Sequence, residues 1–239
     1  MIQNPKPSVW EAMTEANKVR AKELVWLYVF TLLILIAWIG IFRFLFNLRG
    51  VQLERLSAVF ANFCVFGVLV LWAHKMKGMN LHELGLRRGR WSIKRSMLCG
   101  LAVGTGVFIV PLVCMGWAGK FVSGLPKNWL FLSFILPLSF VGMSQLILGP
   151  IIEEVIDRGL LFSYLKTRYG VSRGLVIQAL IFSAMHPFHI SRGIGHFAIY
   201  FSGGLVLGIL FEKSDSLYPG IIAHSALNYG NLLLGSIRL

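Results

Sequence analysis

Long apolar stretches separated by short polar connections run along most of the chain. About 20 apolar residues in a helix cross a hydrocarbon layer roughly 30 Å thick, so these stretches are candidate membrane helices. The candidates are residues 24–46, 57–73, 96–118, 129–149, 151–165, 174–185, 196–211 and 218–235. Backbone groups in hydrocarbon must be satisfied within their own segment, and the stretches lack the alternating pattern of barrel strands. The pattern therefore predicts an all-α fold, a polytopic transmembrane helix bundle with seven or eight membrane helices.

The composition agrees with lipid as the solvent of this chain. Apolar residues make up 56% of the sequence and charged residues 14%, against about 45–50% and 25% in soluble domains. We expect a polar cytoplasmic segment at 1–23 and a single transmembrane domain at 24–239. The first segment contains Pro5 and Pro7 and lacks the short apolar core of a cleaved signal peptide, so the first span is expected to remain as an anchor.

The chain has a net charge of +13, and its basic residues lie between the spans rather than on one folded polar face. This distribution argues against nucleic acid as a partner. Basic residues concentrate in the first 23 positions and in an insert at 74–95, and the positive-inside rule predicts that both are cytoplasmic. We expect the plasma (inner) membrane of a prokaryote as the location. The insert mixes leucines with arginines, such as Leu84 and Arg87, so it is expected either to lie on an anionic lipid surface or to be a solvated loop.

Three of the ten acidic residues, Glu153, Glu154 and Asp157, lie within five positions in one of the most apolar regions. Ionisable groups at membrane depth are costly unless they are paired or hydrated, so they are candidates for function. At helical spacing Glu154 pairs with Arg158, and Glu153 lies on an adjacent face about 100° away as the candidate general base. The alternative is an interfacial charge patch at the end of a span. Pro150 is expected to start a new helix with both glutamates in its first turn.

Two histidines and an asparagine follow at a repeated four-residue spacing. His186 comes four positions after Phe182 at the end of an apolar stretch, and Asn228 comes four positions after His224 on the last stretch. Each pair alone is typical of a satisfied polar residue or of a hydrogen bond between helices. Together with Glu153 they supply a base, a proton partner and oxyanion donors for attack of water on a carbonyl group.

The ordered motifs EExxxR, FxxxH and HxxxN resemble the CPBP family of CAAX proteases and bacteriocin-processing enzymes, also called the Abi family. The similarity covers residues 145–230, including GGLVLGILFEKSDSLYPGIIAHSALN, and is weaker in LHELGLRR. The resemblance implies an intramembrane endopeptidase without a cofactor, whose partners are the lipid bilayer and a membrane-anchored peptide or protein substrate. It makes 24–239 a protease domain with a water-filled cavity.

The same resemblance assigns roles to individual residues. The glutamate matching Glu153 activates water, helped by the histidine matching His186. Glu154 and Arg158 form a supporting pair, and His224 and Asn228 hold the oxyanion or the water, as the motifs that they match imply.

Asp157 departs from the family pattern, which usually has an aromatic residue before the arginine. A carboxylate there places a like charge one turn from Glu153, which disfavours ionisation of both groups. Alternatively, Asp157 competes with Glu154 for Arg158 and loosens the site.

Other functions stay open at this point. Histidines and a glutamate can hold a catalytic zinc ion, but the HExxH signature is missing, since the pair that begins at His82 is followed by Leu86 where a histidine would stand. We therefore expect no metal. A non-proteolytic scaffold or immunity factor on the same fold is an alternative, against which the intact motifs argue. A transporter is a third, but no inverted repeat supports it.

Overall fold

The computed structural model describes residues 19–114, 138–186 and 194–236, and every regular element in these ranges is helical. Elements labelled η are π-helical segments, which are wider than α-helical turns. The elements are α2 (Ala21–Leu45), α3 (Gly50–Val70), η1 (Leu71–Met76), α4 (Ile93–Cys114), α7 (Phe140–Met143), η2 (Ser144–Leu148), α8 (Gly149–Glu153), η3 (Glu154–Phe162), α9 (Ser163–Ala184), α11 (Ile194–Ser214) and α12 (Tyr218–Ser236). The predicted all-α fold is confirmed for the described residues.

Some of these helices have the dimensions of membrane spans. Four described segments are long and apolar enough to cross a membrane: Ala21–Leu45, Arg55–Lys75, Ile93–Val110 and Ile194–Ser214. The larger number of seven or eight crossings stays a prediction. Most of the predicted segment 1–23 and the first part of the predicted stretch 129–149 lie outside the described residues.

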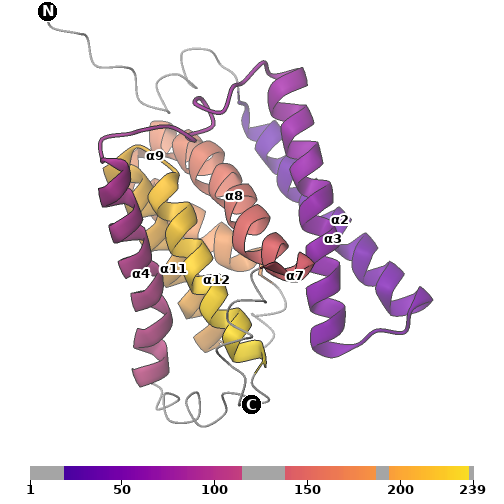
Figure 1. The fold of residues 1–239 in the computed structure, drawn as a ribbon. Helices are drawn as coiled ribbons and strands as arrows, with labels where there is room; N and C mark the ends of the chain where they lie inside the picture. The colour runs from indigo at the N-terminus through magenta and orange to yellow at the C-terminus, as the bar shows by residue number, and fades with distance from the viewer. Residues whose placement is uncertain (1–18, 115–137, 187–193, 237–239) are drawn as a thin grey trace, which may run out of the picture.

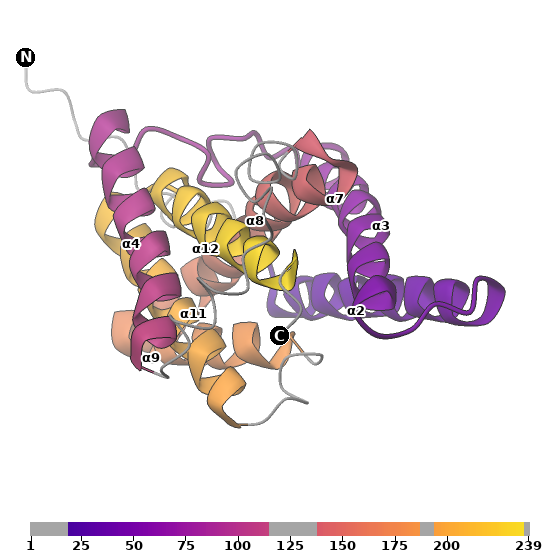
Figure 2. The same ribbon diagram turned by 60° about the horizontal axis from the view of Figure 1, so that its bottom comes forward.

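The helices pack in pairs beside one central helix (Figure 1). α2 packs on α3, α12 on α4, and α11 on α9. In the central helix, η2 and α8 contact α3 on one side and α12 on the other. Figure 2 shows one end of α2 extending away from the remaining helices, whereas α3 runs beside α7 and α8, and α4 lies beside α12. The two halves of the bundle therefore meet at the helix that carries the acidic cluster.

The main apolar core surrounds η3. Leu160 and Phe162 of η3 are fully buried, and they share one cluster with Leu27 of α2, Leu69 of α3 and Phe211 of α11. Burial of a large apolar side chain stabilises a fold by about 1.5–3 kcal/mol in water, but between helices in lipid the gain comes from close packing instead. This packing fixes the helix from which Glu154 and Arg158 project.

The predicted start of a new helix at Pro150 is wrong. The chain is helical without a break from Phe140, through η2, α8 and η3, into α9. Proline removes a backbone donor and crowds the preceding turn, and π-helical turns on both sides of α8 accommodate it. Glu153 and Glu154 consequently lie inside a continuous helix rather than in a first turn, so the expected dipole effect of that helix does not apply to them.

Gly170 folds α9 back on itself. Its φ of 79° and ψ of 169° are non-helical, in a region that glycine adopts readily. A Cβ on Gly174 would lie 3.1 Å from the backbone nitrogen of Lys166, so the two arms touch closely near the turn. Further along, the guanidinium carbon of Arg158 lies 4.4 Å from the ring centroid of Phe182. The elements α7 to α9 thus form a helical hairpin in which positions equidistant from Gly170 face each other.

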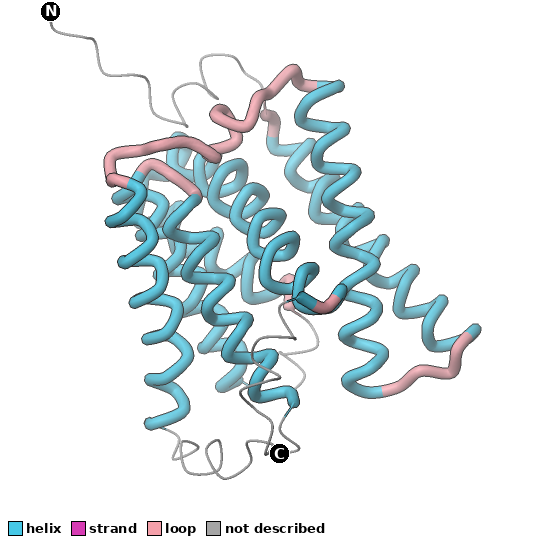
Figure 3. Tube along the Cα trace, in the orientation of Figure 1, coloured by secondary structure: helices cyan, strands magenta, loops and turns pink. Residues whose placement is uncertain are grey.

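The basic insert crosses one end of the bundle between α3 and α4 (Figure 3). Leu84 and Arg87 are buried, and Arg87 pairs with Asp215 in the turn between α11 and α12. The backbone N–H of Leu217 donates to the carbonyl oxygen of Gly85 at 3.0 Å. Neither contact with lipid nor a solvated loop describes Leu84 and Arg87, because both side chains face protein. The insert fastens the α11–α12 turn to the bundle.

Candidate active site

The α7–α9 hairpin brings Glu153 and His186 together, and α12 adds His224. The Oε2 atom of Glu153 lies 3.6 Å from Nε2 of His186 and 3.6 Å from Nε2 of His224. This oxygen is shielded and has no hydrogen-bond partner within the described part of the chain, whereas 32% of the Glu153 side chain is exposed. The carboxylate is therefore accessible, and one of its oxygens faces two imidazoles.

Both imidazoles present Nε2 to Glu153 because their Nδ1 atoms are already engaged. Nδ1 of His186 lies 2.7 Å from the carbonyl oxygen of Phe182, which can only accept, so we assign a hydrogen to Nδ1. Nδ1 of His224 lies 3.3 Å from Oε1 of Glu154, which assigns its hydrogen in the same way. In a neutral imidazole the other nitrogen is then an acceptor. When a ring is neutral, its Nε2 is an acceptor, and a molecule with two hydrogens to donate, such as water, can then bridge the Glu153 carboxylate and that imidazole.

Aromatic rings fix the orientation of His186. Its ring centroid lies 4.4 Å from that of Tyr200 on α11, at an interplanar angle of 29°, and 4.7 Å from that of Phe182. The Oγ atom of Ser183 donates to the carbonyl oxygen of Phe197 at 2.9 Å, which joins the end of α9 to α11. The FxxxH spacing therefore provides both a carbonyl acceptor and a ring contact for the histidine from the preceding turn.

Arg158 and Glu154 form the predicted pair in the interior of the protein. Both side chains are fully buried, with 3.0 Å between Nη1 of Arg158 and Oε1 of Glu154. Nη2 of Arg158 also donates to the carbonyl oxygen of Gly204 on α11 at 3.4 Å, and the guanidinium lies over the Phe182 ring. Since Glu154 in turn contacts His224, the pair links three elements and orients the imidazole that faces Glu153.

The lack of a side chain at Gly220 allows the Glu154 carboxylate to pack against α12. A Cβ on Gly220 would lie 2.6 Å from Oε2 of Glu154, so the carboxylate lies directly against this part of the backbone. Gly220 belongs to the first turn of α12, at the end of the helix that carries a partial positive charge. The buried negative charge of Glu154 is thus stabilised by Arg158 and by the start of a helix.

Asp157 has a partner that the sequence did not reveal. It is buried and accepts a hydrogen bond from the hydroxyl of Tyr28 on α2. Its Oδ2 lies 3.7 Å from Nη1 of Arg158, which is farther than the 3.0 Å to Glu154. Asp157 is thus held by a separate donor while Arg158 stays closer to Glu154. Tyr28 was missed because a tyrosine in an apolar stretch is also typical of a membrane helix.

Asn228 lies on the same helix as His224, but one of its donors is already used. Its Nδ2 donates to the carbonyl oxygen of Gln145 at 2.9 Å, a hydrogen bond between two helices. One amide hydrogen and the amide oxygen of Asn228 are left over from this bond. The predicted oxyanion role of Asn228 stays a prediction.

A second asparagine, Asn62 of α3, lies near Glu153 and was not singled out from the sequence. Its Nδ2 donates to Oγ of Ser144 at 3.2 Å. A Cβ on Gly149 would lie 3.2 Å from Nδ2 of Asn62 and 4.0 Å from Oε1 of Glu153. The lack of a side chain at Gly149 therefore leaves open the space between the amide and the carboxylate. An amide in an otherwise apolar stretch was the signal that could have identified it.

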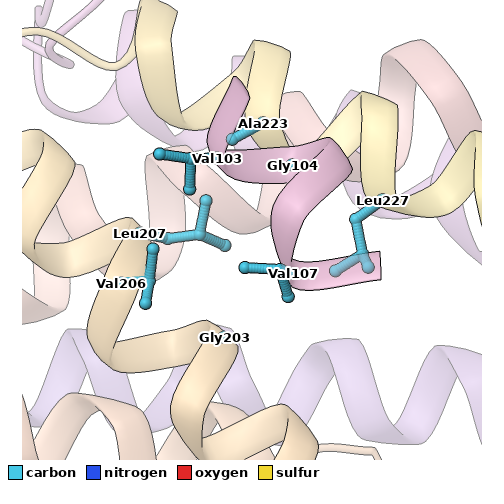
Figure 4. Close-up of a pocket in the computed structure, with 8 residues that line it drawn as sticks. All are labelled: Val103, Gly104, Val107, Gly203, Val206, Leu207, Ala223 and Leu227. Carbon is cyan, nitrogen blue, oxygen red and sulfur yellow. The ribbon is translucent and has the colours of Figure 1, made fainter. Parts of the chain in front are cut away.

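An apolar groove lies beside this cluster (Figure 4). Its cavity volume is only about 10 Å³, with walls from α4 and α11 and a floor from α12. Its lining residues are Val103, Gly104, Val107, Gly203, Val206, Leu207, Ala223 and Leu227. Ala223 and Leu227 immediately precede His224 and Asn228, so the groove opens on the face of α12 next to the one that carries the polar cluster. None of the predicted site residues lines it.

Histidine and carboxylate side chains of this kind could also bind a metal ion. Among the residues that the structure describes, no group of three or more histidine, cysteine, aspartate or glutamate side chains is arranged to hold a metal ion. The zinc alternative thus gains no support from the geometry.

Comparison with known proteins gives one match. Residues 129–230 match the family described as type II CAAX prenyl endopeptidase Rce1-like. The matched range contains all six predicted site residues, and it confirms the family resemblance that the motifs indicated. No curated protein and no solved structure matched the chain.

Proposed function

Because residues 129–230 match the Rce1-like family of type II CAAX prenyl endopeptidases, we propose that the protein is an intramembrane glutamic endopeptidase. It hydrolyses a peptide bond in a membrane-anchored peptide or protein, with Glu153 as the general base. The observation that carries this proposal is the position of Glu153 Oε2, which lies 3.6 Å from Nε2 of both His186 and His224.

The reaction begins with a water molecule bound between Glu153 and an imidazole. Glu153 removes one proton of this water as its oxygen forms a bond to the carbonyl carbon of the substrate. The resulting tetrahedral oxyanion collapses, the C–N bond breaks, and the leaving amine takes the proton from the Glu153 carboxyl group. The products are an amine and a carboxylic acid, which ionises to a carboxylate by releasing its proton to solvent, and no oxidant or reductant is needed.

The surrounding residues hold this arrangement. His186 accepts the second hydrogen of the water through Nε2, because its Nδ1–H is directed to the carbonyl of Phe182. Glu154 and Arg158 keep the ring of His224 turned toward Glu153. We assign the oxyanion to the remaining amide hydrogen of Asn228. Preorganised donors of this kind contribute about 10²–10³ to the rate in other hydrolases.

The matched family suggests the first substrate to test, a peptide whose C-terminal region carries a prenylated cysteine. Purified protein in liposomes would be incubated with this peptide and with the same peptide lacking the prenyl group, and products would be identified by mass spectrometry. Glu153→Gln and His186→Ala are expected to lower cleavage by a factor of at least about 10². Both variants should elute like the wild type in size-exclusion chromatography.

The matched control is His82→Ala, which removes an exposed histidine in the basic insert and should leave the rate unchanged. Wild-type cleavage by Glu153→Gln would overturn the proposed mechanism. Cleavage of the unprenylated peptide alone would keep the endopeptidase activity and exclude the prenylated class.

A further inference from the structure

Pro150 removes one backbone donor from the interior of the central helix. A residue at this position would donate to the carbonyl of Leu146 in an α-helical pattern, or to that of Gln145 in the π-helical pattern of η2. Proline has no N–H and can supply neither bond. Pro150 is fully buried in the protein interior, so a carbonyl group left unsatisfied beside it would be costly.

Side chains of α12 provide the missing donors. Oγ of Ser225 lies 2.7 Å from the carbonyl oxygen of Leu146, and Nδ2 of Asn228 lies 2.9 Å from that of Gln145. Ser225 Oγ also lies 2.8 Å from the carbonyl oxygen of Ile221, but a hydroxyl has only one hydrogen to donate. The carbonyl of Ile221 lies inside α12, where the backbone ladder already supplies a donor. Of these two carbonyl groups, that of Leu146 is therefore the one that needs a side-chain donor.

These bonds join the two helices that carry the reacting groups. Glu153 lies one turn after Pro150 on the central helix, and His224 immediately precedes Ser225 on α12. A helix rises 1.5 Å per residue, so a slip of α12 by one residue would alter the 3.6 Å separation of His224 Nε2 and Glu153 Oε2 by a comparable amount. Catalysis is sensitive to displacements of about 1 Å.

We infer that Ser225 is a positioning residue: its hydroxyl satisfies the carbonyl that Pro150 leaves free and thereby sets His224 against Glu153. The role of Ser225 in catalysis rests on the proposed function, whereas its hydrogen bond to the Pro150 turn does not. Ser225 touches neither the reacting oxygen nor the oxyanion, and it acts through the placement of α12.

The test is a double-mutant cycle with Ser225→Ala, Pro150→Ala and the double variant, measured for kcat on the peptide that the wild type cleaves. Ser225→Ala is expected to lower kcat roughly tenfold, as expected for a small displacement in the site. Pro150→Ala restores the missing backbone donor to this turn, so in that background Ser225→Ala should change kcat less than about twofold. Equal effects of Ser225→Ala in both backgrounds would overturn the inference.

A conservative variant and a matched control complete the design. Ser225→Thr keeps the hydroxyl and should retain most of the rate, and equal losses for alanine and threonine would contradict the inference. Ser202→Ala on α11 is the control, because Ser202 Oγ donates to the carbonyl of Ala198 in its own helix at 2.8 Å and should not matter for turnover.

Unfolding in detergent separates this inference from the proposed function. The same four proteins of the cycle would be compared by their thermal midpoints. Ser225→Ala is expected to lower the thermal midpoint of the wild type, and to lower it much less in the Pro150→Ala background. This result supports the hydrogen bond from Ser225 to the Pro150 turn, even if the wild type cleaves no peptide. Additive losses in the midpoints would show that Ser225 does not serve the Pro150 turn.

Discussion

Glu154 and Gly220 are so close that a single methyl group on Gly220 would come within 2.6 Å of the carboxylate oxygen Oε2. The oxygen belongs to a flexible side chain, but Arg158 and His224 both hold that carboxylate, and the side chain is fully buried. A shift of Glu154 would therefore displace the two residues that it contacts. This contact makes Gly220 a sensitive position although it takes no part in the chemistry.

We predict that Gly220→Ala lowers cleavage at least tenfold and destabilises the protein by about 1–3 kcal/mol, as overpacking of a buried site does. Rates on the cleaved peptide and unfolding in detergent would be measured together. Gly106→Ala on α4 is the control, since a Cβ there would have no neighbour within 4 Å. Wild-type rates and stability in Gly220→Ala would show that Glu154 can move without consequence.

The buried Glu154–Arg158 pair should be more sensitive to the loss of one partner than to the loss of both. Arg158→Met leaves a buried carboxylate without its guanidinium, which costs about 3–5 kcal/mol in other proteins. The double variant Glu154→Gln with Arg158→Met should recover a large part of that loss, because no unpaired charge is left. The stability of the single and the double variant would be measured as unfolding midpoints in detergent. A double variant less stable than Arg158→Met would contradict the prediction.

Activity should survive treatment with EDTA or phenanthroline. The proposed base is a carboxylate, which accepts the proton of water without a metal ion to lower the pKa of that water. Initial rates before and after chelation would be compared, with a zinc protease treated in parallel as the positive control. If activity were lost on chelation and restored by added zinc, the metal alternative would replace the proposed mechanism.

Tyr28→Phe should lower cleavage several-fold. The substitution removes the hydroxyl that donates to buried Asp157, which also lies 3.7 Å from Nη1 of Arg158. Without that donor, Asp157 turns toward Arg158 and competes with Glu154, and loss of such a bond costs about 1–3 kcal/mol.

The dependence on Asp157 can be tested directly. In an Asp157→Phe background, which restores the usual aromatic residue of the family pattern, Tyr28→Phe should have little further effect on the rate. Tyr169→Phe is the control, because Tyr169 is exposed near the turn of the α7–α9 hairpin. An equal effect of Tyr28→Phe in both backgrounds would exclude Asp157 as the group through which it acts.

The sequence was sufficient to predict the helical fold and the residues that meet in the site. Apolar stretches of suitable length predict helices for any chain in lipid, and ionisable groups within them stand out because they are costly there. Glu153, His186 and His224 come from separate motifs, and the Glu153 carboxylate lies 3.6 Å from Nε2 of each imidazole. The catalytic roles of these residues stay predictions until turnover is measured.

The errors have a common physical origin. Pro150 was expected to start a helix because local rules treat proline as a boundary, whereas donors from Ser225 and Asn228 on α12 allow the helix to continue. The burial of Arg87 depends in the same way on Asp215, a partner 128 positions away. Such compensation comes from tertiary contacts, and no local pattern in the sequence records it.

The α7–α9 hairpin also has a consequence for biosynthesis. A chain is made from its N-terminus, so this hairpin is synthesised before α12 and His224. Arg158 lies one helical turn from Glu154 and 4.4 Å from the ring of Phe182, so its charge is matched by groups of the hairpin itself. The hairpin therefore carries a counter-charge for Glu154 during insertion, and the two-histidine environment of Glu153 is completed only when α12 arrives.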